Sequence, residues 1–91
     1  MSDGRGRALH VRVISPDRVG YEGDVVSLVA PAHDGEVGIL RGHAPMTVLL
    51  GSGELRLRTV GGEVERLRVS RGFLQVIDDR VNVLAEEVEE T

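Results

Sequence analysis

The sequence has no cysteine, no lysine and no tryptophan, and only one tyrosine and one phenylalanine. Without cysteine there is no disulfide framework, no thiolate zinc or iron–sulfur site and no cysteine nucleophile. Because every basic side chain other than histidine is an arginine, there is also no P-loop lysine, no Schiff-base lysine and no lysine to carry a lipoyl or biotinyl group. We therefore expect no cofactor.

Charge and hydropathy exclude two further kinds of interaction. A formal net charge of -4 and two aromatic residues give neither a basic face nor a base-stacking platform, so nucleic-acid binding is not expected. No apolar run approaches the roughly 20 residues of a membrane-spanning helix. The first residues also lack the hydrophobic segment of a signal peptide. We expect no direct insertion into a membrane.

The chain does contain enough aliphatic residues for one small core. Its 91 residues include fifteen valines, ten leucines and three isoleucines. Frequent glycines separate β-branched segments in which apolar and polar residues alternate, as in short strands. This pattern predicts an all-β sandwich or barrel of about eight or more strands over residues 9–86. A flexible N-terminus at 1–8 and an acidic tail at 87–91, too charged to be core, are expected to flank it.

The alternation also predicts individual strands and turns. Two hairpin turns are expected, a two-residue primed turn at Gly61–Gly62 and a second turn at Asp78–Asp79. Val64 is opposite in parity to the later apolar residues of its strand, which predicts a bulge or an edge position near Glu65. The first expected strand starts at residue 9 and stops at Ser15-Pro16-Asp17, where proline breaks the ladder. The others are 21–30, 35–40, 46–50, 55–60, 63–70, 73–77 and 80–84.

The residues that could carry chemistry are scattered. His10 has the outward parity of its strand, while His33 and His43 lie in loops without the close-spaced partners that metal ligands usually have. No serine has the G-x-S-x-G context of a nucleophile. Asp78 and Asp79 are adjacent in a tight turn, so their carboxylates diverge instead of converging on a substrate. We expect no catalytic residues and no metal site.

The segment from His33 to Pro45 has two interpretations. Its three glycines and final proline prescribe a looped ribbon, on which Glu36, Arg41 and His43 are placed to pair with something outside it. Alternatively, the glycines only turn corners and His43 caps a neighbouring carbonyl. The residues alone leave both interpretations open.

Several motifs resemble the epsilon subunit of F-type ATP synthases, called delta in mitochondria. The resemblance covers about residues 9–86, and its most specific part is the G-E-x-G-x-x-x-G-H-A-P run at 35–45. Arg41 stands where the family often has proline, which should loosen the turn but keep the Gly-His step. The matching segments are Val13-Ile14-Ser15-Pro16-Asp17, Tyr21-Glu22-Gly23, Gly35 to Pro45, Arg71-Gly72-Phe73-Leu74-Gln75-Val76 and Arg80-Val81-Asn82-Val83-Leu84-Ala85.

The resemblance implies a ten-stranded, mainly antiparallel β-sandwich at the foot of the central stalk. Such a domain is noncatalytic, binds the gamma subunit and the c-ring, and couples proton or sodium transport to ATP synthesis. The complex would lie on the cytoplasmic face of the bacterial inner membrane. Matched by position, Ser15 and Val48 would lie toward gamma. The c-ring interface would comprise Glu36, Gly38, Arg41, Gly42 and His43.

Family members commonly continue into a two-helix C-terminal domain, which binds ATP in some of them. This sequence contains no such helical segment, and we expect no ATP binding by it. Two other functions compete with the rotor interpretation: a free-standing β-sandwich that binds a small ligand or peptide, and a small hydrolase built from the scattered Ser, His and Asp. Tight association with a gamma-type subunit would distinguish the rotor interpretation from both competitors.

Overall fold

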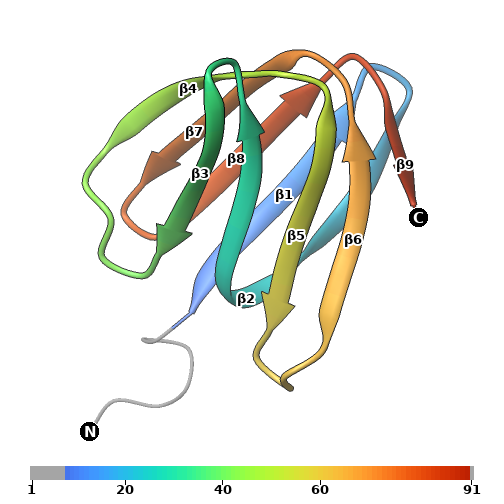
Figure 1. Cartoon of the computed structure of the whole chain (residues 1–91). Helices are drawn as coiled ribbons and strands as arrows, with labels where there is room; N and C mark the ends of the chain where they lie inside the picture. Colours follow the sequence, from blue (N-terminus) through green and yellow to red (C-terminus); the bar gives the residue numbers. More distant parts are fainter. Residues whose placement is uncertain (1–7, 91) are drawn as a thin grey trace, which may run out of the picture.

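The computed structural model describes residues 8–90, which form nine strands and no helix, so the all-β prediction is confirmed (Figure 1). None of the described residues therefore belongs to a helix that could cross a membrane. The predicted flexible segment lies outside the described residues except for Ala8. The strands are β1 Leu9–Ser15, β2 Arg18–Ala32, β3 Gly35–Leu40, β4 Met46–Leu50, β5 Gly53–Thr59, β6 Val64–Val69, β7 Gly72–Ile77, β8 Arg80–Ala85 and β9 Val88–Glu90.

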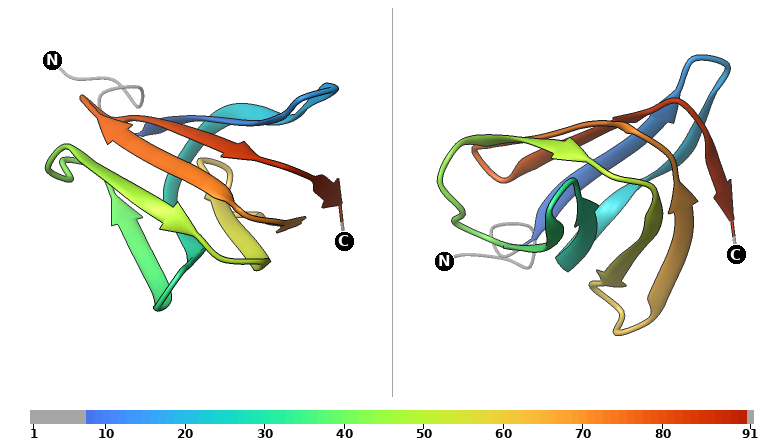
Figure 2. Two further views of the ribbon diagram at one scale, coloured as in Figure 1. Left: turned by 90° about the horizontal axis from the view of Figure 1, so that it is seen from above. Right: turned by 45° about the horizontal axis from the view of Figure 1, so that its top comes forward.

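The strands pack as two layers that share β2 (Figure 2). In the first layer, the first half of β2 pairs with β1, followed by β8, β7 and β4. In the second layer, the other half of β2 lies between β3 and β5, and β6 and β9 follow β5. A register shift between Val25 and Ser27 marks the change of layer, because a bulge bends a strand. Among the described strand pairs only β1–β8 is parallel.

The space between the layers is filled by aliphatic side chains. On strands such as β8, alternate residues face inward, there Val81, Val83 and Ala85. No polar or charged side chain within residues 8–90 is buried. The stability of the sandwich therefore depends on burial of apolar surface and on the backbone ladders, without an internal polar network.

The two predicted hairpin turns differ in outcome. Asp78–Asp79 has positive φ at both residues, 51° and 61°, as a primed two-residue turn requires. The two-residue turn predicted at Gly61–Gly62 is wrong, because only Gly62 has positive φ. Gly62 N–H instead donates to the Thr59 carbonyl at 3.0 Å, and Thr59 N–H donates to the Glu63 carbonyl at 2.8 Å. This closes a three-residue loop, in which one glycine at the last position is enough.

The irregular parity of β6 comes from an edge position. The β5–β6 ladder has no register shift, so no bulge is present near Glu65. β9 pairs only with Leu67–Val69, which leaves the first half of β6 with a neighbour on one side. Val64 is 41% exposed there. Of the two predicted explanations, the edge position is confirmed.

The acidic C-terminal residues contribute to the sandwich. Val88–Glu90 form β9, and Val88 is only 5% exposed. A Cβ atom added to Gly20 would lie 2.5 Å from Val88 Cγ1, and Arg18 Nη2 donates to the Val88 carbonyl at 2.6 Å. The prediction that residues 87–91 lie outside the core is therefore wrong for Val88. A single apolar residue among glutamates can reach the core, because side chains of a strand alternate between its two faces.

Candidate functional site: two contact surfaces

Four apolar side chains form a row across the outer face of the first layer. In register, Ile14 of β1 pairs with Leu84 of β8, Leu84 with Phe73 of β7, and Phe73 with Leu49 of β4. Phe73 is 52%, Leu49 51% and Leu84 42% exposed. We call these four residues the apolar row. Soluble monomers seldom expose contiguous apolar side chains in this way unless the surface binds something.

The apolar row lines an open groove of about 780 Å³. Arg71 and Glu86 give the groove a charged rim, and Ser15 also lines it. Ser15 Oγ donates to Asp17 Oδ1 at 2.9 Å. At Gly72, an added Cβ atom would lie 1.8 Å from the Leu84 carbonyl oxygen, so the floor of the groove is closed by direct approach of two backbones.

Val48, expected on the gamma side, points the other way from the apolar row. It is half-buried and packs against the core, whereas its neighbour Leu49 is on the outer face. The four residues of the apolar row were not singled out from the sequence. A signal for them exists, since consecutive apolar residues in a strand, such as Phe73-Leu74, place one side chain on each face.

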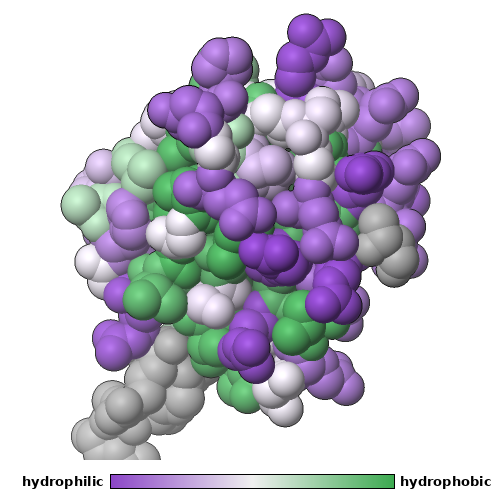
Figure 3. Space-filling view, viewed as in Figure 1, coloured by the Kyte–Doolittle hydropathy of each residue, from purple (hydrophilic) through white to green (hydrophobic). Residues whose placement is uncertain are grey.

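The face shown in Figure 3 carries many hydrophilic residues, with hydrophobic patches between them. Glu36 lies on β3, an edge strand that pairs only with β2 among the described strands. Its carboxylate is 3.4 Å from Arg56 Nη2 on β5, and Arg56 also lies 4.0 Å from the Glu54 carboxylate. Around Gly38 an added Cβ atom would meet nothing within 4 Å. The start of β3 is thus an accessible, partly ion-paired edge.

The loop after β3 contains the other residues expected at the c-ring. Arg41 is exposed, and Gly42 has φ of 83°. His43 N–H donates to the Leu40 carbonyl at 3.2 Å, and His43 Nδ1 lies 2.8 Å from the Ala44 carbonyl. Because a carbonyl can only accept, Nδ1 is the donor in this contact, and Nε2 is not used in it. The predicted capping contact therefore exists, and it still leaves one ring nitrogen for a partner.

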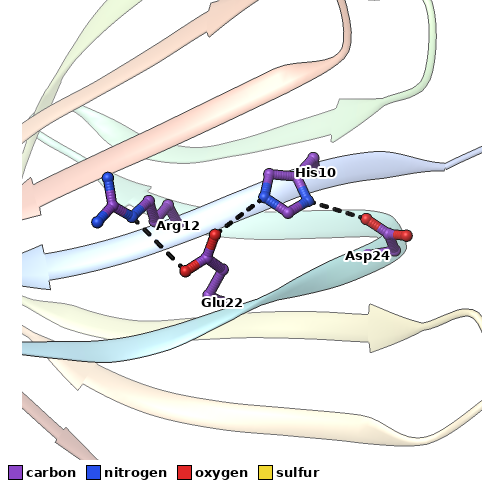
Figure 4. Close-up of polar contacts among 4 residues, drawn as sticks. All are labelled: His10, Arg12, Glu22 and Asp24. Carbon is purple, nitrogen blue, oxygen red and sulfur yellow. Dashed lines mark hydrogen bonds and ion pairs between the residues drawn. The ribbon is translucent and has the colours of Figure 1, made fainter.

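His10 on β1 has two carboxylate neighbours on β2, Glu22 and Asp24 (Figure 4). His10 Nδ1 is 3.0 Å from Asp24 Oδ1 and His10 Nε2 is 3.2 Å from Glu22 Oε2, with Arg12 Nε 3.7 Å from the other Glu22 oxygen. The hydrogen bonds to Asp24 and then Glu22 raise the pKa of His10 above 6.5. The two carboxylates lie at opposite ring nitrogens, and no group of described residues is arranged to hold a metal ion.

Comparison with known proteins supplies the family. Residues 8–91 match the family described as ATP synthase, Delta/Epsilon chain, beta-sandwich domain. A protein of Dichelobacter nodosus named ATP synthase epsilon chain is 46% identical, and the match covers 85% of this chain and 54% of that protein. A protein of Anoxybacillus flavithermus with the same name is 43% identical, and the match covers 91% of this chain and 61% of that protein. The chain thus spans little more than half the length of these relatives.

Solved structures have the same fold. A chain of the mitochondrial ATP synthase of Euglena gracilis, in its OSCP/F1/c-ring assembly, superposes with a TM-score of 0.86 at 23% identity, covering 92% of this chain and 54% of that one. A chain of the Tetrahymena thermophila central stalk and c-ring has a TM-score of 0.74 at 15% identity, covering 90% and 66%. With the matched family and the motif at residues 35–45, they confirm the predicted resemblance: this chain belongs to the delta/epsilon-chain β-sandwich family of ATP synthases.

Proposed function

We propose that this chain is the noncatalytic β-sandwich part of a central-stalk rotor subunit of an F-type ATP synthase. It binds the gamma subunit and the c-ring and couples proton or sodium transport to ATP synthesis. The observation that carries the proposal is the apolar row, which is exposed on the outer face of the first layer. A subunit that turns with its partners needs a persistent contact with an apolar, desolvated centre.

The gamma subunit is the proposed occupant of the groove. Apolar side chains of gamma would cover the apolar row, while Arg71 and Glu86 at the rim would provide polar contacts at the periphery. Ser15 lines this groove, in keeping with its expected place toward gamma. Leu49 replaces Val48 as the residue of β4 that meets gamma, since the Val48 side chain packs inward.

The c-ring is the proposed partner of β3 and the loop that follows it, through Glu36, Gly38, Arg41, Gly42 and His43. Polar loops of the c-ring would have to supply hydrogen-bond donors. Glu36 accepts from a guanidinium in place of, or together with, Arg56. His43 has Nε2 left for a c-ring partner, since its Nδ1 bonds the Ala44 carbonyl. Docked this way, the chain is peripheral on the cytoplasmic face of the bacterial inner membrane, as part of the synthase.

One observation favours a second function, that of a free-standing binding module. The groove volume of about 780 Å³ is within the usual size of small-molecule sites. Under this alternative a small ligand or peptide covers the apolar row and no gamma subunit is needed. The hydrolase interpretation has no comparable support, because the described residues bring together no nucleophile, base and orienting acid.

Copurification with a tagged gamma subunit tests the proposal. Phe73→Glu places a charge in the middle of the apolar row, and we expect it to weaken gamma binding at least about tenfold. Val60→Glu is the matched control, because Val60 is equally exposed but lies in the β5–β6 turn. Equal binding by the two variants would show that the apolar row is not the gamma contact. No gamma binding by the parent chain would contradict the rotor function and favour the binding module.

A further inference from the structure

Asp79 connects three parts of the molecule that are distant in sequence. Its carbonyl accepts a hydrogen bond from His10 N–H at 2.9 Å, which fixes the β7–β8 turn to the start of β1. Its side-chain Oδ1 accepts from Gly42 N–H at 2.6 Å, which reaches the loop between β3 and β4 (Figure 1). The backbone of Asp79 is therefore anchored, and its carboxylate holds the loop.

Few other hydrogen bonds hold the loop. Residues 41–45 belong to no strand, and their other backbone bond is the local one from His43 N–H to the Leu40 carbonyl. Within residues 8–90, no side chain outside the loop other than Asp79 is hydrogen-bonded to it. A carboxylate that accepts from a backbone N–H makes a charge-assisted bond, stronger than a neutral one. Gly42 also has φ of 83°, a conformation that glycine adopts as one of several.

We propose that Asp79 is a positioning residue for the c-ring contact: its carboxylate keeps Gly42 and His43 in the conformation that meets the c-ring loops. The inference rests on the proposed function, because it assumes that this loop is the contact. Asp79 itself need not touch the c-ring. Without its carboxylate the loop would sample several conformations, and binding would have to select one of them, at a cost in ordering entropy.

The neighbouring residue provides a matched control. Asp78 and Asp79 both have positive φ, 51° and 61°, so glycine fits either position without strain. Asp78→Gly and Asp79→Gly each remove one carboxylate from the same turn, which makes their effect on net charge identical. No hydrogen bond or ion pair involves the Asp78 side chain among the described residues. Asp79→Asn keeps an acceptor oxygen and tolerates positive φ, and serves as the conservative rescue.

Two measurements on the full chain test the inference. Amide hydrogen exchange at Gly42 and His43, followed by NMR, reports how firmly the loop is held. Affinity for c-rings in lipid nanodiscs, measured on the complex of each variant with gamma, reports the contact. We expect Asp79→Gly to raise Gly42 exchange and to weaken c-ring binding, each by about tenfold. Asp78→Gly should leave both unchanged, and Asp79→Asn should restore most of both.

The outcomes separate this inference from the function it rests on. Equal Gly42 exchange in Asp78→Gly and Asp79→Gly would overturn the positioning role, whatever happens to binding. Faster exchange in Asp79→Gly with unchanged c-ring affinity would overturn the inference in a different way, because the loop would be held by Asp79 but would not be the contact. If Asp79→Gly does not fold, Asp79→Ala replaces it and Asp78→Ala is its control, because alanine also has no acceptor oxygen and both positions have similar positive φ.

Discussion

The C-terminal strand offers the sharpest test of how this small sandwich is stabilised. Val88→Ala removes two methyl groups from a side chain that is 5% exposed and sits against Gly20. Gly20 has no side chain that could move into the space, and the Arg18 bond to the Val88 carbonyl holds the strand in place. The substitution should therefore leave a cavity instead of a collapsed contact.

The size of the effect follows from the buried groups. At about 0.8 kcal/mol for each buried methyl or methylene, the transfer term is about 1.6 kcal/mol. An unfilled cavity adds to this, so we expect a loss of about 2 kcal/mol in the free energy of unfolding. For a domain of this size, that corresponds to a fall of about 8 to 16 °C in the melting temperature.

Urea unfolding followed by circular dichroism measures the loss, with Val64→Ala as the control. Val64 is the same residue type on the neighbouring strand β6, but it is 41% exposed. Its replacement should cost less than about 0.5 kcal/mol. If Val88→Ala costs no more than Val64→Ala, then β9 does not contribute to the core in solution, and the reasoning from burial is refuted.

Two further predictions concern backbone approach and pH. Gly72→Ala should cost at least about 3 kcal/mol in unfolding free energy, because its Cβ atom would lie 1.8 Å from a backbone carbonyl oxygen of β8. Gly38→Ala is the control and should be close to neutral, because its Cβ atom would meet nothing within 4 Å. Equal melting temperatures for the two variants would contradict this prediction. The pKa of His10 is raised above 6.5 in the folded protein, by Asp24 first and then Glu22, so its contribution to stability is complete below pH 6.5 and is lost as the pH rises through the folded-state pKa. These groups are about half exposed, so the difference in unfolding free energy between the parent and His10→Gln should change by less than about 1 kcal/mol between pH 5 and 8. The parent should have its larger advantage at pH 5, and a larger advantage at pH 8 would contradict the prediction.

The sequence predicted those strands whose ends carry special backbone residues. β3 and β4 begin and end where expected, because glycine and proline bound them and their apolar residues are unambiguous. The Asp78–Asp79 turn was predicted for the same kind of reason. β9 was missed because a single valine among glutamates gives no periodic signal. Its pairing with β6 depends on contacts distant in sequence, which composition cannot show.

The residues of the candidate site also differ in whether they could be predicted from the sequence. The residues of the loop at 41–45 could be named from their motif, since they are contiguous in sequence. The apolar row could not, because Ile14, Leu84, Phe73 and Leu49 become neighbours only through the register of three strand pairs. The bond from Gly42 to Asp79 likewise joins residues 37 positions apart. Contacts set by register are absent from local patterns.

The passage of β2 through both layers has a mechanical consequence. The proposed gamma contact lies on the first layer and the proposed c-ring contact on an edge of the second, so a turning force must pass between the layers. In a sandwich held only by interdigitated side chains, that force would be resisted by packing alone. Here a continuous covalent backbone crosses at Val25–Ser27, with ladders to β1 before the crossing and to β3 and β5 after it. To slide one layer over the other, the force would have to shear several backbone hydrogen bonds at once, which makes β2 the stiff element of the domain.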